Sequence, residues 1–190
     1  MARVNNETDT IVFIPAYDIL GVPNAVLPEG LVPWDELTAA QIDYYAVVTT
    51  PGHANAGAGG NVTCALVSDA FTLNLTDSAE DDEKTLCDPG NSVDLTDLNF
   101  DADMTGFRDA VPASTTSVFN LWRNLTFAPD IPYIVIHRVG YESTVAFDDD
   151  QEIYTYFGLT DLAVNVHADG SMQKIQSVLV PKAALGPRAL

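Results

Sequence analysis

The chain has 190 residues, 27 of them acidic and 8 basic, which gives a formal net charge of −19. This length predicts one domain, or one domain with long arms. So few lysines and arginines exclude an ordinary DNA-binding surface and a basic amphipathic membrane anchor. Hydrophobic residues make up 47% of the chain, enough to bury a core. Most of the acidic residues are aspartate, which favours turns over helix interiors and indicates a loop-rich β protein.

The start of the sequence shows no charged segment followed by an apolar run and small residues, so we expect an intracellular protein. No run of about eighteen apolar residues occurs, and no membrane partner is therefore expected. Cys64 and Cys87 are too few for a disulfide framework, and we interpret both as plain thiols.

Residues 1–35 are predicted to form an extended N-terminal arm with one strand at 10–14. Four prolines between 15 and 34 argue against a continuous helix or a central strand in this region. Apolar side chains are nevertheless frequent there and must be buried against the domain or against a neighbouring copy. We therefore interpret the arm as a packed segment and not as a linker.

Residues 35–42 are predicted to form one helical turn, and 44–49 a strand. The next segment, 50–61, is rich in glycine and alanine and has the most flexible composition of the chain. Long loops of this kind inside compact domains are typically functional or mobile. This one is not a phosphate-binding loop, because neither Lys-Ser nor Lys-Thr follows its glycines.

From residue 61 onward, hydrophobic residues recur at every second position over 62–66 and 71–75, which predicts half-buried strands. Residues 77–83 are predicted to form an acidic turn. A strand over 93–104 is predicted with a β-bulge, because its apolar positions change parity midway. The polar face of this strand carries Asp97, Asp101 and Asp103.

Val118, Leu121, Trp122 and Leu125 follow the i, i+3, i+4, i+7 spacing of an amphipathic helix, and hydroxyl residues at 114–116 offer an N-cap. Later strands are predicted at 133–139, 152–159, 161–168 and 172–180, with a hairpin turn at 168–171. Pro181 is expected to close the fold and to leave 183–190 as a short C-terminal tail. The predicted fold is mainly β: a β-sandwich or half-barrel over 36–182, with one flanking helix and extended arms and loops.

The sequence contains no pattern that predicts catalysis. His53, His137 and His167 form no paired-histidine motif, which disfavours zinc. The acidic runs at 81–83 and 148–150 lack the ligand spacing of a calcium loop and are interpreted as solvated turns. We therefore predict no enzyme, no cofactor and no metal.

Several short segments, in a fixed order, resemble one protein family. The acidic segment SAEDDEKTLCDPGN (78–91) precedes a strand ending in MTGFRD (104–109), the helix SVFNLWR (117–123) and the turn APDIPY (128–133). The last part, from EIYTY (152–156) to QKIQSVLVP (173–181), is similar to that family's closing hairpin. Over about residues 62–182 the chain resembles the major tail proteins, or tail tube proteins, of long flexible-tailed bacteriophages, especially those of actinobacteria. Its strong acidity departs from many relatives.

The resemblance implies a structural virion protein of the phage tail that is assembled in the host cytoplasm. It implies hexameric rings that stack head to tail into a tube, through which double-stranded DNA passes without specific binding. The implied partners are other copies of the chain, the tape measure protein and the tail completion proteins. The arm and the glycine loop would connect rings, with candidate contacts at Ile19, Leu20, Val22, Trp34, His53 and Asn55. The candidate lumen-facing acidic residues are Asp81, Asp82, Glu83, Asp97, Asp101 and Asp103.

Three other protein classes remain open at this point. Another virion structural protein, such as a head decoration protein, would have a similar composition. A salt-adapted β-sandwich binding module would use its acidic residues for hydration, remain monomeric and unfold at low salt. An acidic glycan-processing enzyme would place Asp101 and Asp103 in a cleft lined by exposed aromatic residues.

Overall fold

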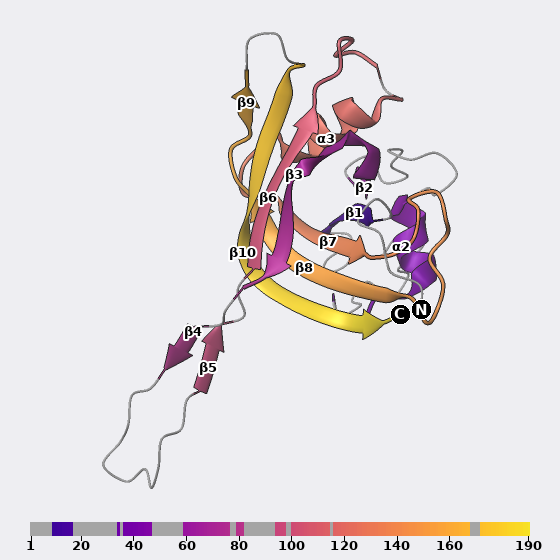
Figure 1. Cartoon of the computed structure of the whole chain (residues 1–190), viewed down its shortest axis with the longest axis vertical. Coiled ribbons are helices and arrows are strands. Elements are labelled where there is room, and N and C mark those ends of the chain that lie inside the picture. Colours follow the sequence, from indigo (N-terminus) through magenta and orange to yellow (C-terminus); the bar gives the residue numbers. More distant parts are fainter. Residues whose placement is uncertain are drawn as a thin grey trace, which may run out of the picture.

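The computed structural model describes residues 9–16, 34, 36–46, 59–76, 79–81, 94–97, 100–114, 116–167 and 172–190. Its main strands are β1 (Thr10–Pro15), β2 (Gly60–Asn61), β3 (Leu66–Leu75), β6 (Phe100–Phe107), β7 (Pro132–Arg138), β8 (Glu152–Thr160), β9 (Val164–Val166) and β10 (Lys174–Ala189). They form one eight-stranded antiparallel sheet in the order β2-β1-β7-β8-β10-β6-β3, and β9 pairs with β10. The sheet curls on itself (Figure 1), which confirms the predicted mainly β half-barrel.

Strand β10 belongs to two halves of this sheet. Residues 174–178 pair with β6, and 174–176 also with β9, whereas 179–189 pair with β8. We call β9, the first part of β10, β6 and β3 the open half-sheet, and β2, β1, β7, β8 and the rest of β10 the covered half-sheet. The prediction that Pro181 closes the fold is wrong, because β10 continues to Ala189. Among the described residues, 179–189 pair with another strand on one side only, and an edge position tolerates proline.

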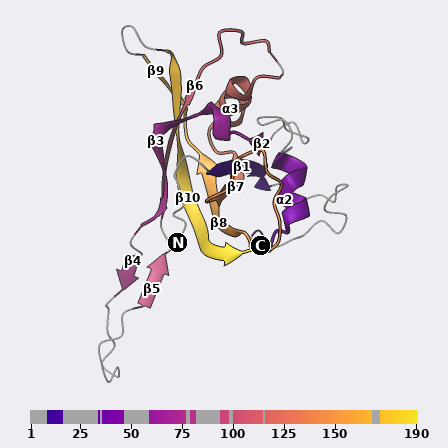
Figure 2. The same ribbon diagram turned by 45° about the vertical axis from the view of Figure 1, so that its right-hand side comes forward.

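Strands β1 and β7 of the covered half-sheet are buried on both faces. In β1, the predicted N-terminal strand, Ile11 and Phe13 point into the core inside the curl. Val12 and Ile14 point the other way and pack with helix α2 (Ala39–Ala46) in a second cluster. Figure 2 shows α2 on the outer side of this half-sheet. A strand covered on both faces is apolar at successive positions, which explains why β1 does not alternate.

The prediction of a strand over 44–49 is wrong for residues 44–46, the part that the structure describes, because they belong to helix α2. Ile42, Tyr45 and Ala46 are buried against the sheet and are spaced i, i+3, i+4, as on one face of a helix. Gln41 accepts a hydrogen bond from the backbone N–H of Thr38, which fixes the first turn. The tertiary contact with the sheet therefore overrides the strand preference of the two tyrosines.

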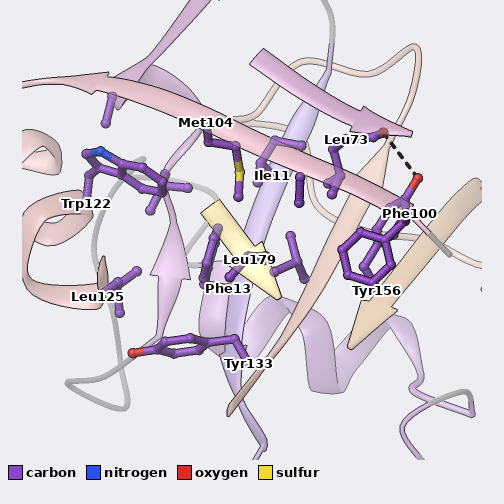
Figure 3. Close-up of a cluster of buried hydrophobic side chains, with 14 of the residues drawn as sticks. Ile11, Phe13, Leu73, Phe100, Met104, Trp122, Leu125, Tyr133, Tyr156 and Leu179 are labelled. Atoms are coloured by element: carbon purple, nitrogen blue, oxygen red, sulfur yellow. Dashed lines mark hydrogen bonds between the residues drawn. The ribbon is translucent and has the colours of Figure 1, made fainter. Parts of the chain in front are cut away.

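Helix α3 (Val118–Thr126) is confirmed, and it closes the curl at one end. Its N-cap is Ser117 and not a residue of 114–116, and the Ser117 side chain accepts a hydrogen bond from the backbone N–H of Asn120. Trp122 and Leu125 enter the core with residues of both half-sheets (Figure 3). Within that core the Tyr156 hydroxyl donates a 3.3 Å hydrogen bond to the carbonyl of Leu73, linking β8 to β3.

Two further predicted strands differ from the structure. Thr63–Ala65 form a short 3-10 turn, η2, where a strand was predicted over 62–66. The predicted bulged strand over 93–104 is two strands, β5 (Asp94–Asp97) and β6. β5 pairs with β4 (Ala79–Asp81), whereas β6 pairs with β3 and β10. The β4–β5 hairpin extends away from the eight-stranded sheet (Figures 1 and 2).

Candidate assembly surfaces

The open half-sheet has one face on the core and one face in solvent. In β6, Ala102 and Met104 are buried in the core, so Asp101 and Asp103 project to the other side. Asp101 is exposed and Asp103 is half-buried. The prediction that Asp101 and Asp103 share the polar face of one strand is therefore confirmed. Asp97 does not belong to it, because it lies in β5 and pairs with β4.

Neighbouring strands complete this acidic face. Thr72 and Asn74 of β3 lie opposite Asp103 and Asp101, and Val178 of β10 lies opposite Asp103 on the other side. The amide of Gln176 donates hydrogen bonds of 2.9 and 2.8 Å to the two carboxylate oxygens of Asp103. These partners come from distant parts of the chain and were missed by the sequence analysis, because the register of pairing cannot be read from periodicity.

The open half-sheet also has unpaired edges. Among the described residues, β3 pairs only with β6, and β9 pairs only with β10. Beside the β9 edge, Val164 is 58% exposed and Val178 is 41% exposed. A ten-residue edge strand such as β3 offers a row of free N–H and C=O groups to another chain. Both edges are therefore candidate surfaces for pairing between copies.

A cleft of about 480 Å³ opens between β3 and the ends of β1 and β7. At its wall, His137 Nε2 lies 3.3 Å from Asp9 Oδ2. Burial lowers the pKa of His137, and the nearby charge of Asp9 partly offsets this by favouring the protonated imidazole. The sequence analysis did not single out this pair. The cleft is lined by Asp9, Ile11, Thr63, Leu66, Ser68, Phe71, Leu73, Asn74, His137 and Val139.

Arg138, the last residue of β7, is fully buried. Its guanidinium lies 4.0 Å from the ring centre of Phe147 and donates hydrogen bonds to Thr10 Oγ1 and Gln151 Oε1. It also donates to three backbone carbonyls in the loop that follows β7, those of residues 142, 145 and 146. Burial lowers the pKa of Arg138 to about 10, although the charge of Asp43 opposes this. Arg138 thus fixes that loop to β1.

The remaining candidate residues are distributed as follows. Asp81 lies in β4. Trp34 is half-buried and packs against Phe157 of β8, with ring centres 6.3 Å apart. The other candidates lie outside the described residues: Ile19, Leu20, Val22, His53, Asn55, Asp82 and Glu83.

Within the described parts of the chain, no three His, Cys, Asp or Glu side chains gather closely enough to hold a metal ion. In the same residues, no helix has both the length and the apolar character needed to cross a bilayer. Cys64 is an exposed free thiol, and Cys87 lies outside the described residues.

A protein-family model described as "Phage tail tube protein" matches residues 27–189, a range that includes both half-sheets except β1 and also the β4–β5 hairpin. No curated protein matches the sequence. The matched region contains Asp101, Asp103 and the free edges of the open half-sheet.

Proposed function

We propose that this chain, which belongs to the phage tail tube protein family and is a structural protein of the virion tail, forms hexameric rings. These rings stack head to tail into the tail tube. The observation that carries the ring proposal is the outer edge of β3, which no other described strand pairs with. An edge strand of ten residues that stays unpaired invites uncontrolled aggregation, so pairing with a fixed partner is the stable solution.

In the proposed ring, the β3 edge of one copy pairs with the β9 edge of the next. The contact joins two different surfaces of the same chain, so it is heterologous and closes only if the rotation per copy divides a full turn. The exposed Val164 and Val178 beside the β9 edge then become buried at the interface. Their burial supplies the apolar contribution to the contact.

The open half-sheet then lines the lumen, with Asp101 and Asp103 facing the passing DNA. Carboxylates repel phosphates and offer none of the cationic contacts that hold DNA on a protein. Gln176 keeps the Asp103 carboxylate in place, because both of its oxygens accept hydrogen bonds from the same amide. The tape measure protein would occupy this lumen before the DNA does, and the tail completion proteins would cap the tube.

Electron microscopy of the purified protein tests this function. We expect hollow tubes of uniform width, and averaged end views should show six copies in each ring. A protein that stays monomeric at every concentration and salt, and also when supplied with tail initiation complexes, would contradict the proposal. A monomer that in addition unfolds at low salt would instead identify the salt-adapted binding module.

A further inference from the structure

The cleft beside the β3 edge, of about 480 Å³, lies on the core side of the open half-sheet, away from the face of Asp101 and Asp103. Its wall includes Ile11 and Leu73 of the core and Phe71, which packs against the core. Ligand pockets in proteins have volumes of about 300–1,000 Å³, so this cleft has room for a large side chain. We call it the large cleft. An apolar hollow beside a strand edge that no described strand pairs with is typical of a protein interface.

The large cleft also carries a carboxylate whose charge is only partly compensated. Asp9 Oδ2 lies 3.3 Å from His137 Nε2, whereas the other oxygen, Oδ1, accepts no hydrogen bond from a described residue. Burial lowers the pKa of His137, which favours the neutral imidazole at neutral pH. The side chain of Asp9 is 25% exposed, so its negative charge is accessible to a cation from another subunit.

At the opposite edge of the open half-sheet, an exposed aromatic ring and an arginine lie beside β9. Phe127, which follows α3, is 66% exposed, and the guanidinium of Arg123 lies 5.4 Å from its ring centre. Arg123 forms no ion pair with a carboxylate of the described residues. Aromatic and arginine side chains are enriched at protein interfaces. Both side chains line a small cleft of about 100 Å³, together with Arg108, Ala163, Asn165 and Ile175.

The large and the small cleft lie on the same face and at the same level of the open half-sheet. Ile175 is part of the core and pairs with Asn165, so the small cleft also opens on the core side. Leu66, which lines the large cleft, pairs with Gly106, and Gly106 pairs with Ile175. One row of paired residues therefore runs from the large cleft at the β3 edge to the small cleft at the β9 edge. Figure 1 shows β3 and β9 at the two edges of this half-sheet.

We propose that Phe127 and Arg123 of one copy dock into the large cleft of its neighbour in the same ring, where the Arg123 guanidinium pairs with Asp9. This inference rests on the proposed ring, in which the β9 edge of the first copy pairs with the β3 edge of the second. Copies related by rotation about one axis turn the same face of the sheet outward, so the core side of one open half-sheet continues into the core side of the next. The phenyl group and the guanidinium then fill the large cleft on that side.

This docking would fix the register between the paired edges. Hydrogen bonds between two backbone edges alone permit slippage, because every residue offers the same N–H and C=O groups. A side chain that fits a single cleft, with a charge pair beside it, selects one register. It also places opposite charges at a contact between subunits that each carry a net charge of −19.

Removal of the phenyl group tests the docking. Phe127→Ala should raise the protein concentration needed for tube assembly by about tenfold or more, because an aromatic side chain buried in a partner's pocket is a typical hot spot. Phe127 is exposed in the subunit, so the thermal melt of the unassembled protein should not change. The matched control is Val145→Ala, which truncates another exposed apolar side chain that lines neither cleft. We expect this control to assemble like the wild type.

A charge exchange tests the pairing of Arg123 with Asp9. Arg123→Glu and Asp9→Lys each place like charges together at every contact, and each should raise the assembly concentration by about tenfold or more. The double variant carries both changes in one chain, restores opposite charges at every contact and should assemble near the wild-type concentration. Lys182→Glu is the control, because it changes the net charge as Arg123→Glu does, at an exposed position of β10 that lines neither cleft.

Thermal melts of the unassembled variants identify any that fail to fold. If Asp9→Lys is among them, Asp9→Asn and Arg123→Gln replace the two charge reversals. Each neutral variant should then weaken assembly, and the double variant should lose no more than either single variant, because both changes remove the same contact.

The outcomes separate this contact from the proposed tube. If the wild-type protein forms no tubes, the tube function itself fails. If the wild type forms tubes and the folded Phe127→Ala and Arg123→Glu variants assemble equally well, the tube stands and the docking is wrong. Loss of assembly in both single charge variants without recovery in the double variant also overturns the docking. Normal assembly of these variants with loss of bound tape measure protein would assign the cleft to that partner and again contradict the inference.

Discussion

The indole of Trp122 lies directly against the backbone of Gly106. A methyl group added to Gly106 would come within 3.0 Å of three indole atoms, closer than real side chains approach. The indole N–H donates a 3.3 Å hydrogen bond to the carbonyl of Ile175, so the ring cannot simply rotate away. Helix α3 therefore reaches the open half-sheet because β6 has no side chain at this position.

Gly106→Ala should destabilise the protein by about 1–3 kcal/mol, the usual cost of overpacking a rigid core site. Urea unfolding followed by tryptophan fluorescence measures this loss. A second variant, Trp122→Leu, removes the ring that the new methyl group would strike. We expect the double variant to lose less stability than the sum of the single variants. Strict additivity would show that the contact between the new methyl group and the indole does not cause the loss of stability.

Arg138→Lys should cost roughly 3 kcal/mol of unfolding free energy, because a lysine cannot reproduce the guanidinium's five hydrogen bonds. Chemical denaturation at neutral pH provides the measurement. Arg123→Lys, at a half-buried position, is the control and should change stability by less than about 0.5 kcal/mol. Equal effects of the two changes would rule out the anchoring role of Arg138.

His137 should make the protein less stable as the pH falls below 6.5. Burial lowers its pKa from the ordinary value of 6.5, so in this range the unfolded chain binds a proton more readily than the folded chain. The difference favours the unfolded state increasingly as the pH falls towards the folded pKa. Urea unfolding at pH 7.5 and 5.5 should therefore show a smaller decrease for His137→Gln than for the wild type. His167→Gln, which removes an exposed imidazole, should keep the wild-type decrease.

Ser117→Ala should destabilise the protein by about 1 kcal/mol, the typical value of a helix N-cap. Ser117 also donates a hydrogen bond to Asp109, and this bond is the main cause of the lowered pKa of that carboxyl group. Thermal unfolding of Ser117→Ala and of the exposed neighbour Thr116→Ala gives the comparison. A similar loss of thermal stability in both variants, or a loss in neither, would contradict a specific helix-capping role of Ser117.

If Asp101 faces the lumen as proposed, Asp101→Lys should slow the ejection of DNA from assembled phage, because a lysine at this position would attract phosphates. The effect should be larger at low salt, where charges are screened less. Asp149→Lys, in the exposed loop after Phe147, makes the same charge change away from the open half-sheet and should leave ejection unchanged. Unchanged ejection in Asp101→Lys phage that carry normal tails would refute the lumen assignment.

Local patterns in the sequence predicted the elements whose character depends on local spacing. The i, i+3, i+4, i+7 series identified α3, and the apolar run at 133–139 identified β7 to within one residue at each end. The alternation in β6 correctly placed Asp101 and Asp103 on one face. In each of these cases the neighbouring structure agrees with the local preference, so nothing overrides it.

Features that depend on strand pairing or on packing between distant segments could not be predicted from local patterns in the sequence. Asp97 and Asp101 have the spacing of one strand, but β5 and β6 pair with different partners. Arg108 and Arg123 are fifteen positions apart in the sequence, but both line one small cleft because α3 packs on β6. The burial of Arg138 depends on carbonyl groups of the loop after β7. The path of that loop cannot be predicted from the periodicity of the sequence.

The division of β10 between the two half-sheets also has a mechanical meaning. One continuous backbone runs from the β6 pairing at residues 174–178 into the β8 pairing at 179–189. A load applied along the open half-sheet therefore passes into the covered half-sheet through covalent bonds, and rows of hydrogen bonds resist it in shear. Sliding one half past the other would require many of these bonds to break together. A tube built from such subunits would stretch or bend as a stiff elastic shell while its subunits keep their shape.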